Sequence, residues 1–495
     1  MLKQNTIIKK EGFVMITFFS CVIFLIGGYF IYGKFVDKVF GSDPNKKTPV
    51  MTNADNIDFV PLPTWKSFLI QFLNIAGTGP IFGAIAGAMW GPNAFLWITF
   101  GTIFAGAVHD FLIGMMSLRS KGNSVSELVG ENLGEFPKKI MIGFSVILLL
   151  FVGVVFISSP ADLLASLTHW NRWIFIAIIL VYYIVATVLP IDKVIGKIYP
   201  VFGISLLLMA VGIVFGMVYN GSITQIPEFN FTNPHVNGQS IFPYLFISIA
   251  CGAISGFHAT QSPMMARCMK NEKEGRRVFY GAMVSEGLVA LIWAAAAMTF
   301  FGGLEGLAAE GGKAAIIVNK ISSGLLGRVG MVLAILGVVA CPITSGDTAF
   351  RSIRLTIADA LNLKQDSKIN RYKIVIPVFA VAIAFLFIPF DIIWRYFSWS
   401  NQTLAAIALW SAAVYLKKHG KFYLIALLPA LFMTVVVTCY IIVAPEGFYT
   451  LFVKLGMNVD IKVLEKIGTA IGIGISAICA VGFFKKSKIA CIQQV

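Results

Sequence analysis

The chain has 495 residues, of which 57% are hydrophobic and only 13% are charged. Soluble globular proteins carry roughly twice that share of charge, and one soluble core cannot bury so much apolar surface, so lipid must cover part of it. The net charge of +15 does not indicate nucleic-acid binding, because Lys and Arg lie mostly in short connectors between apolar runs, where the positive-inside rule places them.

Apolar runs long enough to cross roughly 30 Å of hydrocarbon recur along the chain. The spanning elements must be helices, because strands of a barrel would show shorter alternating segments. We predict an all-α polytopic membrane protein with thirteen transmembrane helices, near residues 12–33, 67–90, 94–117, 138–158, 172–189, 199–219, 241–266, 277–301, 326–345, 372–390, 393–416, 421–443 and 464–484.

Two segments need separate treatment. The run 12–33 follows two lysines like a signal peptide, but no A-x-A cleavage site follows it, so we predict a retained first span. The stretch 305–325 is amphipathic and too short to span, and we expect it to be re-entrant or to lie at the surface. The seven cysteines form no C-x-x-C pair, and inert buried thiols are expected.

The distribution of basic residues predicts the topology. With the N-terminus outside and the C-terminus in the cytoplasm, the inner segments hold 28 of the 39 Lys and Arg residues, and the long loop 220–240 holds none. This bias agrees with the positive-inside rule. Lys3, Lys9 and Lys10, in the N-terminal tail, oppose it.

Two predicted spans are interrupted in the same manner. The second span contains IAGTGP at 75–80, and the seventh contains IACGAISG at 249–256. Gly and Pro unwind helices, and unwound backbone at membrane depth persists only around a cavity. The alternative is that transmembrane helices are simply rich in Gly.

The two breaks lie five spans apart, so their helices run in opposite directions. Matched broken spans in two halves are typical of an inverted repeat with a binding site near the bilayer midplane. We predict one transmembrane domain over 1–495, with repeats at 67–219 and 241–416. The span 12–33 and the two spans within 421–484 are additions to the repeats.

Several blocks of sequence, in order, resemble a known family. They are FVP near Phe59, IAGTGPIFG (75–83), GAVHDFLIGMMSLRSKGNSVSEL (106–128), ACGAISGFH (250–258), YGAM (280–283) and PITSGDTAFRSIR (342–354). Over roughly residues 59–360 the chain is similar to the carbon starvation protein A family. After His258 it reads ATQSPMMARCMK, whereas longer members tend to have a Ser/Thr-rich stretch before a Pro-Lys.

The resemblance implies a transporter of the bacterial plasma membrane with the LeuT-like (amino acid–polyamine–organocation) architecture, a 5+5 inverted repeat with two discontinuous helices. Members of the family are linked to uptake of peptides, and in some cases pyruvate, during nutrient limitation.

The broken helices are the first candidate site. Main-chain N–H groups at a half-helix N-terminus attract a carboxylate, and free carbonyls at a half-helix C-terminus can coordinate a cation. Small residues let the substrate approach the backbone. The predicted substrate-binding residues are Gly77, Thr78, Gly79, Gly252, Ser255, Gly256 and His258.

Ionisable residues inside the apolar runs form a second set. An ionised group at a helix centre costs roughly 2.5–3.5 kcal/mol on insertion scales, so such groups face the interior. Histidine changes protonation readily near neutral pH. We predict a proton relay at His109, Asp110, His258 and Glu286. The alternative is structural: a neutral His, or a helix-capping Asp that ties two helices together.

The run PITSGDT at 342–348 is the third candidate. In LeuT-like transporters, the equivalent helix supplies hydroxyl oxygens to a sodium ion, and hard oxygen ligands suit such a cation. The resemblance therefore makes Thr344, Ser345 and Asp347 candidate sodium ligands. The alternative is that Ser345 or Asp347 caps a helix at 348–361.

These observations predict a secondary active transporter that imports peptides or related small carboxylates by alternating access, driven by Na⁺ or H⁺. No Walker A motif is present, so ATP is not the direct energy source. A pyruvate symporter, a passive channel and a nutrient-sensing membrane protein are the alternatives. No catalytic set can be assembled. The expected partners are a small-molecule substrate and the lipid bilayer, with no further cofactor; the oligomeric state is not predicted.

Overall fold

All regular elements in the described part of the chain are helices. The structure is a computed structural model. It describes residues 15–54, 58–187, 191–312, 314–361, 363, 365, 367–456 and 459–492. For residues 191–200, 344, 368 and 486–492 it describes the backbone only.

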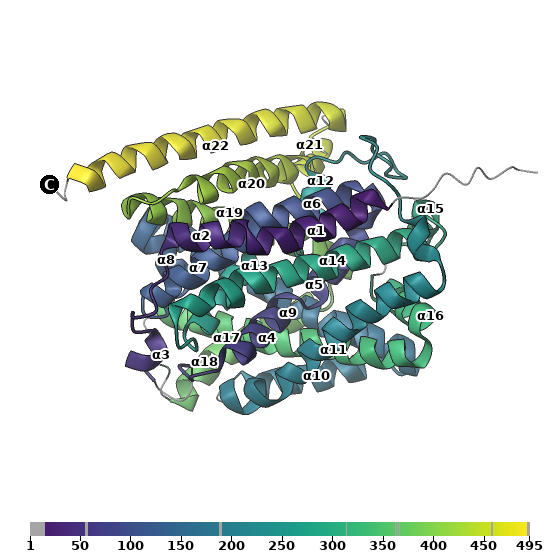
Figure 1. The fold of residues 1–495 in the computed structure, drawn as a ribbon, viewed down its shortest axis with the longest axis horizontal. Coiled ribbons are helices and arrows are strands. Elements are labelled where there is room, and N and C mark those ends of the chain that lie inside the picture. The colour runs from purple at the N-terminus through teal and green to yellow at the C-terminus, as the bar shows by residue number, and fades with distance from the viewer. Residues whose placement is uncertain are drawn as a thin grey trace, which may run out of the picture.

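The helices follow one another along the chain, with a long connector between α11 and α12 (Figure 1). The first half contains α1 (Ile16–Phe30), α2 (Tyr32–Phe40), α3 (Pro49–Thr52), α4 (Thr64–Ile75), α5 (Thr78–Gly87), α6 (Asn93–Gly101), α7 (Ala107–Arg119), α8 (Val125–Leu133), α9 (Glu135–Thr168), α10 (Arg172–Ala186) and α11 (Ile191–Tyr219). The second half contains α12 (Tyr244–Ser248), α13 (Gly256–Ala266), α14 (Gly281–Phe300), α15 (Leu304–Ala309), α16 (Ala314–Ala334), α17 (Ala340–Ala360), α18 (Lys368–Phe385), α19 (Phe390–Lys418), α20 (Leu424–Val443), α21 (Phe448–Lys454) and α22 (Ile461–Ile492).

The number of membrane spans differs from the prediction. In the described chain, eight helices are long and apolar enough to cross a membrane, or nine when the bent pair α4–α5 is counted as one span. The predicted thirteen are therefore not confirmed as full-length spans. The helix α10 has only 15 residues, and the break divides 241–266 into a five-residue α12 and an eleven-residue α13. Residues 12–14 and 188–189 of the predicted spans lie outside the described residues.

Glycine lets the central helices approach closely. A Cβ on Gly114 of α7 would lie 2.5 Å from the ring of Phe279, and a Cβ on Gly153 of α9 would lie 2.5 Å from the ring of Phe350. Without a hydrophobic driving force between helices in lipid, such close van der Waals packing holds a bundle together.

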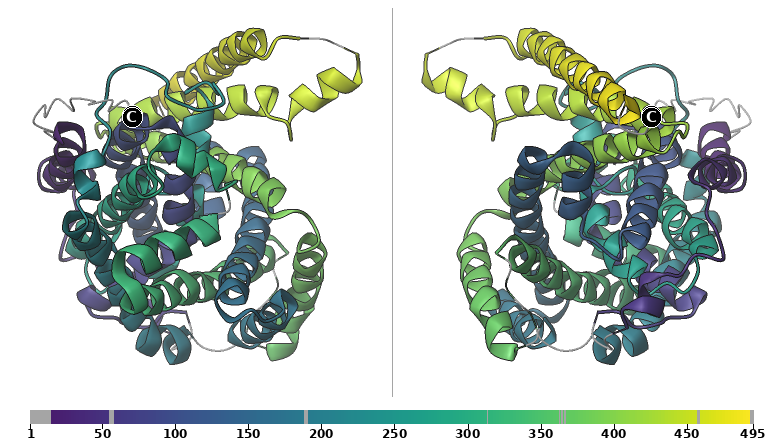
Figure 2. Two further views of the ribbon diagram at one scale, coloured as in Figure 1. Left: turned by 90° about the vertical axis from the view of Figure 1, so that its right-hand side faces the viewer. Right: turned by 90° about the vertical axis from the view of Figure 1, so that its left-hand side faces the viewer.

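The helix α13 lies at the centre of the bundle, in contact with α4, α7, α17 and α19. At one side, α20 packs on α19, and the long α22 lies outermost on α20 (Figures 1 and 2). The predicted division into repeats at 67–219 and 241–416, with two additional spans in 421–484, remains a prediction.

The segment 305–325 forms α15 and the first part of α16. The helix α16 bends at Gly327, where φ is +58°. Before this bend it packs on α11, with Leu326 over Gly212 and Leu325 over Gly216. Residues of both helices line a cavity described below.

Candidate functional site

The first break separates α4 from α5 at Ala76 and Gly77. The two half-helices are bent by 46° to one another, and Gly77 has an extended ψ of −142°. The predicted interruption of the second span is therefore present. The first N–H groups of a helix have no intrahelical partner, so those at the start of α5 are available in the interior of the bundle. The Thr78 side chain is fully buried, and its hydroxyl has no hydrogen-bond partner among the described residues.

The second break, residues 249–255, separates α12 from α13. Gly252 has a φ of +87°, a left-handed conformation that favours glycine. Its neighbours Ala250, Cys251 and Ser255 are buried. The interruption predicted at 249–256 is therefore present as well, and it is longer than the first.

The two breaks lie against each other. A Cβ added to Gly79 would lie 2.7 Å from Sγ of Cys251, and a Cβ added to Gly252 would lie 3.4 Å from Cβ of Pro80. One turn further along α5, a Cβ on Gly83 would lie 3.2 Å from the main-chain oxygen of Ser248. Small residues at these positions let the first turns of α5, directly after the first break, meet the second break.

Polar side chains of α19 hold the second break. The Asn401 Nδ2 donates to the carbonyl of Ala250 at 2.8 Å, and its Oδ1 accepts from the main-chain N–H of Phe257 at 2.7 Å and from the hydroxyl of Ser255 at 3.1 Å. One amide therefore bonds to the main chain on both sides of Gly252.

Gln402 also forms hydrogen bonds to the second break. Its Nε2 donates to the carbonyls of Ile249 and Ile254 at 3.3 and 3.1 Å. From the sequence, Asn401 and Gln402 are candidates for lining the cavity, but spacing alone does not show it, and a role in holding the break was not predicted. The signal was present: two adjacent amides in an apolar span need buried partners. Gly256 also packs on α19, because its Cβ would lie 2.3 Å from the main-chain oxygen of Asn401.

The four predicted relay residues form one contiguous chain. Asp110 of α7 contacts the Nδ1 of His109 through Oδ1 at 2.8 Å and the Nδ1 of His258 through Oδ2 at 2.9 Å. The Nε2 of His258 lies 3.5 Å from Oε2 of Glu286. All four side chains are fully buried. The structural reading also holds, since Asp110 ties α7 to α13; a role in proton transfer stays a prediction.

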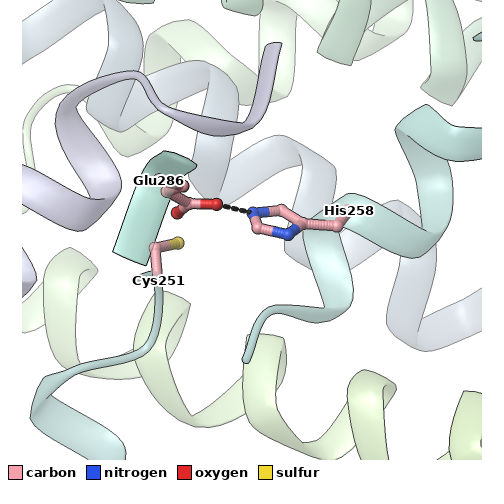
Figure 3. Close-up of side chains that lie close together, drawn as sticks. All are labelled: Cys251, His258 and Glu286. Carbon is pink, nitrogen blue, oxygen red and sulfur yellow. Dashed lines mark ion pairs between the residues drawn. The ribbon is translucent and has the colours of Figure 1, made fainter. Parts of the chain in front are cut away.

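Cys251 adds a thiol beside His258 and Glu286 (Figure 3). One ligand atom from each of the three residues lies within 4.8 Å of the others, and thiolate, imidazole and carboxylate are ligand types for divalent transition metals. His258 and Glu286 form the 3.5 Å ion pair, and the Cys251 sulfur contacts Ser255 and Asn401 at 3.5 Å. The Nε2 of His258 and the Oε2 of Glu286 have no hydrogen-bond partner among the described residues.

Two of the three candidate sodium ligands, Ser345 and Asp347, lie apart in the structure. The Ser345 hydroxyl donates to the carbonyl of Leu73, near the end of α4, at 3.1 Å, and a Cβ on Gly77 would lie 3.6 Å from it. Ser345 therefore lies beside the first break, as a cation site there requires. The side chain of Thr344 lies outside the described residues.

Asp347 does not share the position of Ser345. Two residues along a helix correspond to a turn of about 200°, and Asp347 faces Arg351, 3.9 Å away. Its geometry indicates a buried ion pair. The capping alternative is wrong for both residues, because α17 runs unbroken from Ala340 to Ala360 and no helix begins at 348.

A cavity of about 610 Å³ lies on the face of the 220–240 loop. It lies between α5, the loop at 235–239, α15, α16 and the start of α19. Phe82 of α5 and Ser248, the last residue of α12, belong to its lining. Aromatic and apolar side chains with a few polar groups are typical of small-molecule sites.

A second cavity, of about 460 Å³, lies among connectors that we predict to be cytoplasmic. Phe59, Lys121, Glu127, Arg267 and Asp359 belong to its lining, and no residue of either break does. Neither lining includes a residue of a break, but the larger of these two cavities, on the loop side, includes Ser248, which directly precedes the second break.

Two solved structures share this fold. MhsT in complex with L-phenylalanine superposes with a TM-score of 0.53 at 14% identity, covering 84% of this chain and 98% of that chain. The Eremococcus coleocola manganese transporter superposes with a TM-score of 0.52 at 14% identity, covering 90% of this chain and 99% of that chain. The architecture is therefore LeuT-like, with two discontinuous helices, as the sequence indicates.

Among sequence relatives, a Haemophilus influenzae membrane protein is 43% identical over 340 residues, which covers 58% of this chain and 91% of that protein. The peptide transporter CstA of Campylobacter jejuni is 29% identical, covering 54% of this chain and 48% of its own. The pyruvate/proton symporter BtsT of Escherichia coli is 28% identical, covering 58% and 49%. The chain thus matches about half the length of each of these two named transporters.

The described helices and these relatives agree on a multi-pass membrane protein, and the relatives with named functions cited above are transporters. A family model for carbon starvation protein CstA matches residues 12–233, 157–304 and 294–440, which together span most of the sequence. The chain belongs to the carbon starvation protein CstA family.

Proposed function

We propose that this protein is a secondary active transporter that imports a small carboxylate, either a peptide or a monocarboxylate such as pyruvate, by alternating access. The observation that carries the proposal is the contact between the start of α5, which follows the first break, and the unwound second break, at Gly79 and Cys251. Unwound main chain inside a membrane bundle is tolerated where it serves a binding cavity. The family name suggests that uptake serves cells short of carbon.

The start of α5 is the best place for the substrate carboxylate. Helix N-termini attract anions through their free N–H groups and the helix dipole. The Thr78 hydroxyl is buried without a described partner and can add one more donor. Of the predicted substrate-binding residues, Gly77, Thr78 and Gly79 carry this role, because Asn401 and Gln402 already occupy much of the main chain at the second break.

The unequal cavities support alternating access. The cavity on the 220–240 side includes Ser248, which directly precedes the second break, and Phe82 of α5 in its lining, while the lining of the opposite pocket includes no residue next to either break. With the proposed topology, this conformation is open toward the outside. The complementary conformation would close α15 and the start of α19 over the breaks and open the cytoplasmic side.

We further propose that a proton drives transport. The chain from His109 through Asp110 and His258 to Glu286 links buried groups that can exchange protons, and it ends beside the second break. Sodium is the second candidate, favoured by the position of Ser345 next to Leu73 and Gly77.

Transport by the full chain in proteoliposomes tests these proposals. Labelled di- and tripeptides and labelled pyruvate are offered separately, under a proton gradient or a sodium gradient. We expect saturable counterflow of one substrate class and accumulation with the proton gradient alone. Accumulation that requires a sodium gradient would show that sodium, and not the proton, is the coupling ion. Non-saturable flux with single-channel currents would indicate a channel, and no flux of any tested substrate would leave a sensor as the better reading.

A further inference from the structure

Gly252, in the middle of the second break, is held on both sides of its backbone. Its N–H donates to Oε1 of Glu286 on α14 at 2.9 Å, and its carbonyl accepts from the hydroxyl of Thr102 at 2.9 Å. Thr102 opens the π-helical turn Thr102–Gly106 that joins α6 to α7. Both partners are fully buried. Two side chains from different helices therefore fix the two peptide groups that flank Gly252 in the unwound segment.

The same glycine lies against the first break. A Cβ on Gly252 would lie 2.7 Å from Cβ of Ala290 on α14 and 3.4 Å from Cβ of Pro80 on α5. No side chain separates this backbone from the start of α5, where we place the substrate carboxylate. A shift of the Gly252 peptide is consequently transmitted to Pro80 by direct contact.

Glu286 joins this backbone to the acid–base chain. While Oε1 accepts from Gly252, Oε2 faces the Nε2 of His258 at 3.5 Å. The other ring nitrogen of His258 is held by Asp110 at 2.9 Å. Among the described residues, the titratable groups that interact with Glu286 are His258, Asp110 and Cys341, and Cys251 lies beside them.

The net charge of the Asp110–His258–Glu286 group favours the binding of one further proton. An imidazolium between two carboxylates leaves one net negative charge in a site without solvent exposure. An uncompensated buried charge is unfavourable. One further proton, on Glu286, makes the Asp110–His258–Glu286 group neutral overall.

We propose that Glu286 couples proton binding to the substrate site by holding or releasing the Gly252 peptide. The ionised carboxylate accepts strongly from the Gly252 N–H, and a carboxylic acid accepts more weakly, because charge-assisted hydrogen bonds are about twice as strong as neutral ones. Taking up the proton loosens the second break against Pro80, and losing it restores the grip. Thr102 is a positioning residue that keeps the carbonyl side of the peptide in place. This inference rests on the proposed transport function.

The test uses Glu286→Gln in the full chain, reconstituted with the substrate that the wild type transports. The amide mimics the protonated acid and cannot exchange the proton. We expect counterflow to persist but to lose its pH dependence, and accumulation under a proton gradient to fall to the equilibrium level. Wild-type pH dependence of counterflow, or normal accumulation, would overturn the proposal. Glu272→Gln is the matched control: it also removes a buried carboxylate, which pairs with Arg119, and it should keep accumulation.

Two further measurements protect the test against a misfolded variant. In Thr102→Val, substrate affinity should fall about tenfold, the loss of one hydrogen bond to a buried group, while its pH dependence remains; an unchanged affinity would remove Thr102 from the mechanism. In the wild type, hydrogen exchange of the peptide covering 249–256, corrected for intrinsic rates, should become faster as the pH falls. Protection that does not change with pH would contradict the release of Gly252.

A failure of the coupling role of Glu286 can be distinguished from a failure of the transport proposal. If wild-type proteoliposomes show no counterflow, the transporter assignment fails. If they show counterflow and proton-driven accumulation but Glu286→Gln behaves like the wild type, only the coupling role of Glu286 fails.

Discussion

The two broken helices differ in how their main chain is satisfied. At the first break, two residues separate α4 from α5, and the Thr78 hydroxyl has no described partner. At the second, seven residues separate α12 from α13, and side chains from three other helical segments hold the carbonyls of Ala250 and Gly252 and the N–H groups of Gly252 and Phe257. Buried polar groups need partners, so the difference shows which break is prepared for a ligand. The first break has hydrogen-bond donors that a ligand can use. The main chain of the second break is already hydrogen-bonded to side chains of the protein.

The strongest test of this comparison is Gly79→Leu. Even a Cβ at this position would lie 2.7 Å from Cys251, so a larger side chain must push the two breaks apart. Displacing a site by about 1 Å can cost about 100-fold in rate, and we expect uptake to fall at least about that much with membrane insertion intact. Gly143→Leu is the control, because Gly143 is exposed on α9 with nothing within 4 Å of its Cβ. Retained uptake in Gly79→Leu would count against a site at the breaks.

Thr78→Val sharpens the assignment of the carboxylate to the first break. Removing a hydrogen bond to a charged group costs about 1.5–3 kcal/mol, so the substrate concentration for half-maximal counterflow should rise about 10- to 100-fold. The control is Thr299→Val, whose hydroxyl bonds within its own helix to Ala295. An unchanged half-maximal concentration would mean that the Thr78 hydroxyl does not contact substrate.

Asn401→Ala tests the second break as a structural tie. It leaves the N–H of Phe257 and the carbonyl of Ala250 buried without their partner, and each orphaned group costs about 1–3 kcal/mol. We expect a clearly lower melting temperature of the purified protein in detergent. Thr403→Ala, which removes a bond within α19 to Trp399, should change it little. Equal melting temperatures would show that α19 does not hold the break.

Ser345→Ala should have the smallest effect if a proton is the driving ion. It removes one hydroxyl that donates to Leu73, a bond whose net value is about 1 kcal/mol. Proton-driven uptake in sodium-free buffer should change less than about twofold. A large loss that sodium partly restores would instead indicate a cation site at the first break.

Much of this arrangement could be read from residue types alone. Gly77 and Pro80 at one place, and Gly252 and Gly256 at another, weaken a transmembrane helix, so both breaks could be predicted. The relay residues were predictable individually, because His109, Asp110, His258 and Glu286 are ionisable groups in apolar runs that must find buried partners. Their order along one chain of contacts was not, since it depends on how α7, α13 and α14 pack. The position of Asp347 failed to follow from its motif, because a helix turns its side chain away from Ser345 toward Arg351.

By itself, the sequence determined the environment and the local chemistry of this protein. Its apolar runs require lipid, its glycines and prolines mark where helices unwind, and its buried ionisable residues mark where protons or ions are handled. The tertiary structure decided which of the two breaks is held by side chains of other helices and which has groups available for a ligand. Hydrogen bonds from Asn401, Gln402, Thr102 and Glu286 reach the second break across about 150, 150, 150 and 34 residues of chain respectively. No local pattern encodes such contacts, because they exist only once distant helices pack side by side.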